Sequence, residues 1–512
     1  MLKSTIFVAA SGLMPCLAAS CATMNPDVAP SVERVVIEAD PGTPRPPFVF
    51  SKEDQQFLDE IQYSCFKYFW DAMTPLGANP SGMVPDRSSI TTVSVAGVGF
   101  QLSAICIGVE RKWVTRDEAQ ERVLKILRTL DAPQDNKKAG LFFHFIDGTT
   151  GGQPEKTWEH VVSTIDSALL FAGVLTASEY FGGEVKEIGD RLFTDADWSF
   201  FVSTSKANPT DYGFVSLGWK PNDVSDPTGA GNVLKYCWVD AGDEHRLVTF
   251  LGVCAPTESH RVPLDSYYRL RRKLGDDGQG PMVYFPWSGA LFTDFFAHCW
   301  MDYAGMGPDD PLTNGVRRRS RVDWWENARR HAAMHRRKAI ENPLQVPTLA
   351  EHAWGLTASD YHKGYQVPGL YPTPIDMPGA REGVDYPEEP GHDNYGDGTI
   401  APYGAGSTIM FDPKPAIAAL RYYRSLRAPD GSTLVWKDPA TGGYGFRDAF
   451  NLGKVGEAAW VGPDYLAIDQ GPLMLAIENA RTGFVWKLFH SHPFVQAGMS
   501  RLGLEFPMGS RY

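Results

Sequence analysis

VSVAGVGFQLSAICIGV, residues 93 to 109, is the stretch that decides the fold class. It is apolar on nearly every side of a helix, as expected for a helix enclosed by other helices. The next stretch, TRDEAQERVLKILRTL from Thr115 to Leu130, opens with a Thr and Glu capping box and is apolar on one side only. A buried helix is therefore followed by an amphipathic helix that can cover it.

The same alternation continues along the chain. Residues 158–181 are mostly apolar around one acid, residues 187–201 are amphipathic, and residues 246–253 are apolar again. Other helices are expected from a cap at Ser51 and over 288–303, 322–341, 415–426 and 471–481. Short strand-like pieces are expected at 141–146, 213–219 and 282–285. The pattern predicts a mainly helical protein, a closed double ring whose inner helices surround a pocket. No repeat of fixed period supports the rival solenoid.

The first twenty residues predict a signal peptide. Lys3 precedes an apolar segment, Ile6 to Ala19, that is too short to span a bilayer. Leu17-Ala18-Ala19-Ser20-Cys21 resembles a lipobox, which implies lipidation of Cys21; an ordinary cleavage site with an incidental cysteine is the alternative. Residues 21–50 are a proline-rich spacer and residues 51–512 the folded domain. The protein is thus expected to be exported, either periplasmic or anchored to the outer membrane as a lipoprotein.

Charge and cysteine content exclude several classes of protein. The formal net charge of -13 argues against a nucleic-acid partner, because phosphate binding needs a basic face. The arginines between 317 and 337 are interpreted as a solvated or salt-bridged helix face. Five cysteines remain beyond the N-terminal segment, and this odd number without close pairs predicts neither a disulfide framework nor a zinc site.

The segment WVDAGDEHRLV, residues 238–248, is the strongest candidate for chemistry. It places three carboxylates and a histidine between a tryptophan and an apolar run. An acid buried beside an aromatic ring holds its proton near neutral pH and can donate it. Acids recur beside aromatic residues at 354–360, 444–448 and 465–472. Rings that stack on sugars, together with carboxylates that bind hydroxyls, indicate carbohydrate chemistry.

Several longer motifs carry a family resemblance. They are FPWSGALFT at 285–293, HCWMD at 298–302, WGLTASD at 354–360, DGTIAP at 397–402, YGFRDAFN at 444–451, IDQGP at 468–472 and ENARTGFVW at 478–486. From Ser51 onward the chain resembles the bacterial glucoamylase-like family, which includes the β-1,2-glucanases of glycoside hydrolase family 144. The resemblance implies an (α/α)6 barrel that hydrolyses a β-glucan, with β-1,2-glucan as the first candidate. It also implies inversion of the anomeric centre and no metal or other cofactor.

The resemblance also implies roles for single residues. Glu244 matches the general acid, Asp448 the likeliest base, and Asp166 a helix-borne acid of the pocket. The sequence departs from the family pattern around the acid, at Asp243 to Leu247, and in an insert over 373–394. The sequence therefore does not decide which sugar and which glycosidic linkage the protein recognises. Further side chains expected to contact substrate are Trp238, Asp243, Trp287, Phe292, His298, Trp354, Asp360, Asp397, Tyr403 and Asp469.

Each of these residues also has a purely structural interpretation. Asp360 and Asp397 can close turns, Asp469 can cap the last inner helix, and the tryptophans can belong to the core. His245 and His298 suggest metal ligands, but they lack the spacing of metal-ligand motifs. The main requirement for inverting hydrolysis is that Glu244 and Asp448, far apart in sequence, converge across a hollow with their carboxyl groups about 6.5–9.5 Å apart. A non-catalytic glycan-binding lipoprotein, a transglycosylase, a phosphorylase, and a hydrolase of another glycan are the alternatives.

Overall fold

The computed structural model describes residues 34–72, 81–133, 135–155, 157, 159–205, 211–317, 319–375, 391–454 and 457–506. The expected signal peptide, Cys21 and the first part of the spacer lie outside these ranges, as do Trp158 and residues 376–390 of the insert. Among the described residues, no helix combines the length and the apolar composition needed to cross a membrane.

Five helices are buried on almost every side. They are α2 (Val95–Glu110), α4 (Thr164–Phe181), α6 (Asp243–Cys254), α10 (Pro402–Ser407) and α12 (Ala467–Thr482). In space α6 contacts α4, α4 contacts α2, α2 contacts α12, and α12 contacts α10. The closest approach, between α2 and α4, depends on glycine: a Cβ on Gly99 would lie 2.1 Å from the carbonyl oxygen of Leu169.

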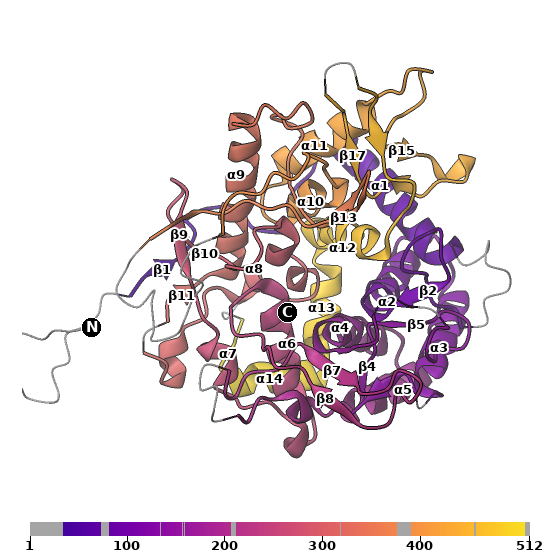
Figure 1. Cartoon of the computed structure of the whole chain (residues 1–512), viewed down its shortest axis with the longest axis vertical. Coiled ribbons are helices and arrows are strands. Elements are labelled where there is room, and N and C mark those ends of the chain that lie inside the picture. Colours follow the sequence, from indigo (N-terminus) through magenta and orange to yellow (C-terminus); the bar gives the residue numbers. More distant parts are fainter. Residues whose placement is uncertain are drawn as a thin grey trace, which may run out of the picture. The chain divides into compact units, whose positions relative to one another are not determined.

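Amphipathic helices cover this inner set. They are α1 (Lys52–Asp71), α3 (Arg116–Asp131), α5 (Gly183–Thr194), α9 (Trp324–Glu341), α11 (Pro413–Ser425), α13 (Phe484–Ser491) and α14 (Pro493–Leu502). Figure 1 shows α3 and α5 on the outer side of α2 and α4, and contacts also join α1 to α2, α11 to α10, and α14 to α6. The predicted alternation of buried and amphipathic helices is confirmed, and the fold is mainly helical.

The helix N-termini predicted from capping residues are confirmed for α1 and α3. Ser51 caps α1 by accepting a hydrogen bond from the Asp54 N–H, and Thr115 and Glu118 form the predicted capping box of α3. Two boundaries differ from the prediction. Residues 187–201 divide into α5 and a 3₁₀ turn, η1 (Trp198–Phe201), and α6 begins three residues before the predicted Arg246. Because of this earlier start, Glu244 lies in the first turn of α6.

The helix predicted over residues 288–303 is wrong. The chain instead forms two 3₁₀ turns, η3 (Leu291–Asp294) and η4 (Ala297–Cys299), and then the short α8 (Tyr303–Met306). The backbone of η4 forms hydrogen bonds with residues elsewhere in the fold. An Asp243 oxygen accepts the N–H of Ala297 over 2.6 Å, and the Asn479 amide donates to the carbonyl of Cys299 over 2.8 Å. Such tertiary hydrogen bonds outweigh the local helical pattern. The turns contact α6 and α12, and Phe295 packs on Tyr403 of α10.

The strands are short and lie in the connections. Two pieces have three strands, β6–β7–β8 and β10–β9–β14, and the pairs are β1–β11, β2–β5, β3–β4, β12–β13, β15–β16 and β17–β18. Their bounds are Val36–Ile37 (β1), Thr92–Ser94 (β2), Lys137–Lys138 (β3), Leu141–Phe142 (β4), Phe145–Asp147 (β5), Val162–Ser163 (β6), Gly218–Pro221 (β7), Gly231–Val233 (β8), Leu274–Asp276 (β9), Pro281–Val283 (β10), Arg321–Val322 (β11), Ser359–Tyr361 (β12), Gly364–Gln366 (β13), Thr373–Pro374 (β14), Trp436–Lys437 (β15), Gly445–Phe446 (β16), Phe450–Asn451 (β17) and Trp460–Val461 (β18). β2 runs directly into α2 and β6 into α4, so paired strands position the N-terminal ends of two inner helices.

Candidate active site

A cavity of about 930 Å³ lies at the N-terminal ends of the inner helices. Four of the inner helices contribute to its lining: Ala96 at the start of α2, Asp166 of α4, Glu244 of α6 and Ile468 of α12. The connecting segments contribute Asp86, Arg87, His144, Trp238, Phe285, Ser288, Phe292, Asp360 and Tyr365, among others. Its volume is at the upper end of the range for small-ligand pockets and suits an oligosaccharide.

Glu244 is the buried acid of this cavity. It is 9% exposed, and burial raises the pKa of its carboxyl well above the usual value, helped by the charges of Asp166 and Asp243. The N-terminal end of a helix favours an anion, but this effect is worth only about 1 kcal/mol and desolvation outweighs it. Glu244 therefore keeps its proton to higher pH than an ordinary glutamate and can donate it to a group in the cavity.

Asp166 faces the cavity from the first turn of α4. Its backbone N–H donates to the N-cap Ser163, and one carboxylate oxygen lies 3.5 Å from Nε2 of His144. On its other side, His144 Nδ1 lies 2.6 Å from a carboxylate oxygen of Glu159. The isolated acid in an apolar helix is thus paired and faces a pocket, as the cost of burying a lone charge requires.

Asp448 and Asp469 form a buried pair of carboxyl groups behind the cavity wall. Asp448 is 1% exposed and accepts the backbone N–H of Asp360 over 2.9 Å, and Asp360 itself lines the cavity. Burial raises the pKa of Asp448 to about 7, and burial together with the charge of Asp448 raises the pKa of Asp469 well above its usual value. Two carboxyls so close cannot both ionise readily, so the pair shares a proton near neutral pH.

The structure therefore contains a cavity of the kind expected from the sequence, but only one of the two proposed catalytic residues, Glu244, lines it. Glu244 lines the cavity, whereas Asp448 is one layer behind, covered by Asp360. Arg87 donates to Asp360 over 2.8 Å and also lies beside Asp86, so that it ties two acids of this wall together.

Aromatic residues make up another part of the wall. Trp238 stacks on His245 with ring centres 4.5 Å apart, and its indole N–H donates to Thr164 over 2.9 Å. Burial lowers the pKa of His245 to about 4, so this ring is neutral and extends the apolar face. Phe292 also lines the cavity. Trp238, Phe292 and Asp360 thus lie where the sequence analysis expected substrate contacts.

Other expected contact residues do not line the cavity. Asp243 and His298 are 1% exposed and bonded to each other, with Nδ1 of His298 3.0 Å from Asp243. Trp354 and Tyr403 belong to the core, where the Tyr403 hydroxyl donates to the carbonyl of Ala358.

Asp397 closes a loop by accepting hydrogen bonds from Thr399 and Gln366. Trp287 is 63% exposed and lies next to Ser288 of the cavity wall. Because the N-cap of α12 is Leu466, Asp469 does not cap that helix.

Four titratable residues of the cavity wall were missed from the sequence. Asp86, Arg87, His144 and Tyr365 all come from connecting segments without helical periodicity. An adjacent acid and arginine at 86 and 87, next to Pro85, was the one local signal of a polar loop. His144 lies between β4 and β5 and Tyr365 lies within β13, where neither spacing nor composition distinguishes them from ordinary surface residues.

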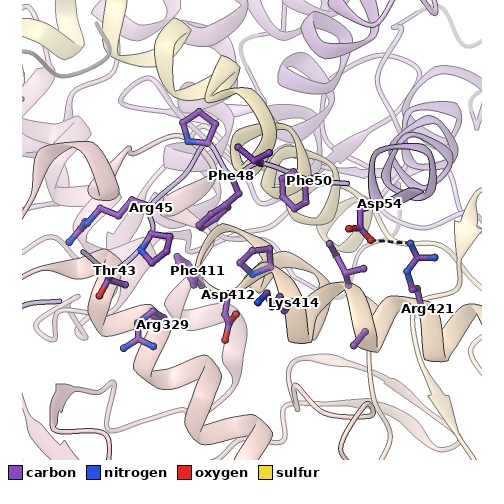
Figure 2. A pocket seen from close by; sticks show the side chains of 16 residues that line it. Thr43, Arg45, Phe48, Phe50, Asp54, Arg329, Phe411, Asp412, Lys414 and Arg421 are labelled. Atoms are coloured by element: carbon purple, nitrogen blue, oxygen red, sulfur yellow. Dashed lines mark hydrogen bonds and ion pairs between the residues drawn. The ribbon is translucent and has the colours of Figure 1, made fainter. Parts of the chain in front are cut away.

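A second cavity, of about 870 Å³, lies at the other end of α12 (Figure 2). The segment from Thr43 to Phe50 forms one wall, and the Phe48 N–H donates to the carbonyl of Ala480 in the last turns of α12. Its polar groups are largely paired: Arg421 with Asp54, and Arg329 with Glu326, which is outside the lining. The carboxyl groups in its lining are those of Asp54 and Asp412.

Within the described ranges, no three or more His, Cys, Asp or Glu side chains are grouped as the ligands of a metal ion would be. The described cysteines are all free thiols, and Cys65, Cys106, Cys254 and Cys299 are buried in the core. The arginines of α9 also follow the prediction, since Arg329 and Arg330 both pair with Glu326.

Comparison with known proteins places this site in a family. Residues 235–493 match the family model "Putative glucoamylase", a span that includes Glu244 and Asp448 but not Asp166. An exo β-1,2-glucooligosaccharide sophorohydrolase (non-reducing end) from Parabacteroides distasonis is 30% identical over an alignment of 485 residues, and the match covers 88% of this chain and 58% of that protein. The chain thus spans somewhat more than half the length of this curated relative.

Two solved structures resemble the whole described fold. A putative glucoamylase from Bacteroides uniformis has a TM-score of 0.69 and 29% identity, covering 90% of this chain and 99% of that one. A β-1,2-glucanase from Parabacteroides distasonis has a TM-score of 0.69 and 26% identity, covering 89% and 60%. The chain belongs to the glucoamylase-like family.

Proposed function

We propose that the protein is an exported glycoside hydrolase that cleaves a β-glucan, with β-1,2-linked glucan as the first candidate. The observation that carries the proposal is the buried carboxyl of Glu244, whose pKa is raised and which faces a cavity of oligosaccharide size among further carboxylates and aromatic rings. Two relatives whose names refer to β-1,2-glucooligosaccharides or β-1,2-glucan support the choice of linkage.

The proposed reaction is an inverting hydrolysis. Glu244 protonates the oxygen of the glycosidic bond, a carboxylate across the sugar ring takes a proton from the attacking water, and the C–O bond breaks as the new one forms. The leaving sugar carries the proton from Glu244, and the base holds the proton from water until both acids are reset by solvent. General acid and base catalysis each contribute about 10²–10⁴-fold.

Two carboxyls are candidates for the base. Asp448, with a pKa raised to about 7, is well matched to proton transfer near neutral pH, but it is covered by Asp360 and needs a small movement or a chain of waters. Asp166 lines the cavity and is close enough to raise the pKa of Glu244. We propose Asp448 as the base and Asp166 as a carboxylate that orients substrate. Added azide or formate should restore part of the activity of an alanine variant of the true base but not of the other.

The contacts among the inner elements also support the finer description of the fold. Five buried helices and the turns η3 and η4 follow one another in space as α6, α4, α2, α12, α10 and residues 291–299. We propose that they form the inner ring of an (α/α)6 barrel in which 3₁₀ turns take the place of one inner helix.

Incubation of the purified domain with linear β-1,2-glucan and a panel of other glycans tests the function. Release of the inverted anomer, followed by NMR, is the expected result, and the Glu244→Gln variant should bind glucan while losing at least about a hundredfold in kcat. Binding without turnover by the wild type would identify a glycan-binding protein instead. Dependence of the products on added phosphate or sugar acceptors would identify a phosphorylase or transglycosylase.

Export rests on the N-terminal sequence alone. We propose cleavage before Cys21 and lipidation of that cysteine, which would tether the domain to a membrane through the spacer. Expression of the full chain and of a Cys21→Ser variant in a Gram-negative host, with metabolic labelling by a fatty acid, should label only the unchanged chain. A labelled variant or an unlabelled wild type would contradict lipidation at this position.

A further inference from the structure

His144 lies between two carboxylates at the edge of the cavity. Its Nδ1 is 2.6 Å from Glu159, and its Nε2 is 3.5 Å from Asp166. Both facing atoms are carboxylate oxygens, which accept but do not donate hydrogen bonds when ionised. A neutral imidazole has one N–H and can serve only one of them, whereas an imidazolium donates from both ring nitrogens.

The backbone holds this arrangement in place from three sides. The N–H of His144 donates to the carbonyl of Val161 over 2.9 Å, and its carbonyl accepts the N–H of Val95 at the start of α2. The Glu159 backbone is fixed through Thr157, whose hydroxyl donates to the Glu159 carbonyl and accepts its N–H. The imidazole also stacks on the Phe145 ring with centres 3.7 Å apart. The ring therefore has little freedom to turn away from either carboxylate.

The charges around His144 favour its cationic form. Burial alone would lower the pKa of His144, but the carboxylates of Asp166, Glu159 and Asp86 outweigh it and raise that pKa. The hydrogen bond from His144 in turn lowers the pKa of Glu159, an effect to which Lys220 adds. Glu159 is 40% exposed at its side chain, so its part of the pair is in contact with solvent.

We propose that His144 and Glu159 are positioning residues for the active site: Glu159 fixes the imidazolium of His144, and the imidazolium holds the Asp166 carboxylate toward the cavity, facing Glu244. Neither residue touches the reacting bond in this assignment. The Asp166 carboxylate gains a fixed direction and a compensating positive charge, while its own charge helps Glu244 to keep a proton. The consequence for turnover rests on the proposed hydrolase function, whereas the cationic state of His144 does not.

The charge state is tested first, without substrate. NMR of the protein labelled at histidine, with the His144 signal identified from its loss in a His144→Gln variant, gives the pKa of this ring. The expected result is a value above the 6.5 of ordinary histidine that falls in Glu159→Gln, because glutamine keeps a hydrogen-bond acceptor but removes the charge. A His144 pKa at or below the ordinary value, or one unchanged by Glu159→Gln, would overturn the proposal even if the enzyme is active.

The kinetic test compares pH profiles of kcat/KM. In Glu159→Gln the imidazolium loses its proton at lower pH, so the alkaline limb should move toward acid. In His144→Gln the cation is missing at every pH, and kcat/KM should fall by up to about a hundredfold, as for a misplaced catalytic group. Glu179→Gln, at the far end of α4 beside Lys186, is the matched control and should leave the profile unchanged.

A merely structural role predicts a different result. Both variants would then lower activity by the same factor at all pH values and reduce the melting temperature in parallel, with unshifted profiles. Overlaid profiles after scaling would therefore refute the positioning role. Absence of any glycan turnover in the wild type would instead refute the hydrolase function and leave the NMR result to decide the state of His144.

Discussion

The indole N–H of Trp287 donates to a carboxylate oxygen of Asp240 over 3.0 Å, although Trp287 is 63% exposed. Asp240 is itself buried and bound by two nitrogens of Arg271, at 2.9 and 2.7 Å. An exposed tryptophan ring is thus held in one orientation beside Ser288 of the cavity wall. A ring fixed in this way loses little entropy when a sugar stacks on it.

This arrangement predicts a sugar-binding platform outside the main cavity. Trp287→Ala should raise KM for long glucan oligosaccharides by roughly tenfold, an effect of about 1.4 kcal/mol, and change KM for the shortest substrate little. Trp287→Phe keeps a ring but loses the bond to Asp240, so an intermediate effect is expected. Kinetics over a series of chain lengths measures this dependence. An equal change at every chain length would contradict a platform beyond the cavity.

The raised pKa of Glu244 predicts a stability that depends on pH. A carboxyl whose pKa is higher in the folded than in the unfolded state stabilises the fold fully below the unfolded value, and this contribution is lost as pH rises toward the folded value. In that window each pH unit costs up to about 1.4 kcal/mol. Glu244→Gln has no such loss and should melt at a higher temperature than the wild type, by a margin that grows from pH 5 to pH 8. Parallel melting curves at all pH values would contradict the raised pKa.

The buried ion pair of Asp243 predicts a structural role for this residue. Its oxygens accept hydrogen bonds from the backbone of η4 and from Arg246, whose side chain is 4% exposed. Asp243→Ala leaves the guanidinium without its partner and should cost about 3–5 kcal/mol in the free energy of unfolding. The exposed pair of Asp265 and Arg269 is the control, since Asp265→Ala should cost at most about 1 kcal/mol. Urea denaturation compares them, and equal losses would be inconsistent with this role.

The pair of Asp448 and Asp469 predicts how the acidic limb of the activity profile responds to mutation. The Asp469 carboxyl donates a hydrogen bond that lowers the pKa of Asp448, so the loss of this bond in Asp469→Ala should raise that pKa. If Asp448 is the base, the acidic limb of kcat/KM should move to higher pH by the same amount. The measurement is kcat/KM from pH 4 to pH 8 for both proteins. An acidic limb that stays in place would assign the base to another carboxyl, with Asp166 as the first choice.

Much of the helical framework was predictable because its signals are local. The all-round apolar residues of α2 and the capping residues Ser51 and Thr115 act through hydrogen bonds and burial within a few turns of chain. Residues 288–303 show the limit of such signals. Their composition is compatible with a helix, but a hydrogen bond donated to Asp243 and another donated by Asn479, both far away in the sequence, stabilise 3₁₀ turns instead.

The sequence by itself determined which helices are buried, where several of them begin, and which acids stand beside aromatic residues, because these properties depend on neighbours in the chain. Tertiary structure alone decided that Glu244 and Asp166 share a cavity, that Asp243 faces Arg246 rather than substrate, and that His144 meets Glu159 and Asp166. The reason is physical: pKa, ion pairing and access to a pocket depend on the distance and burial of groups brought together by folding, and spacing along the chain carries no measure of either.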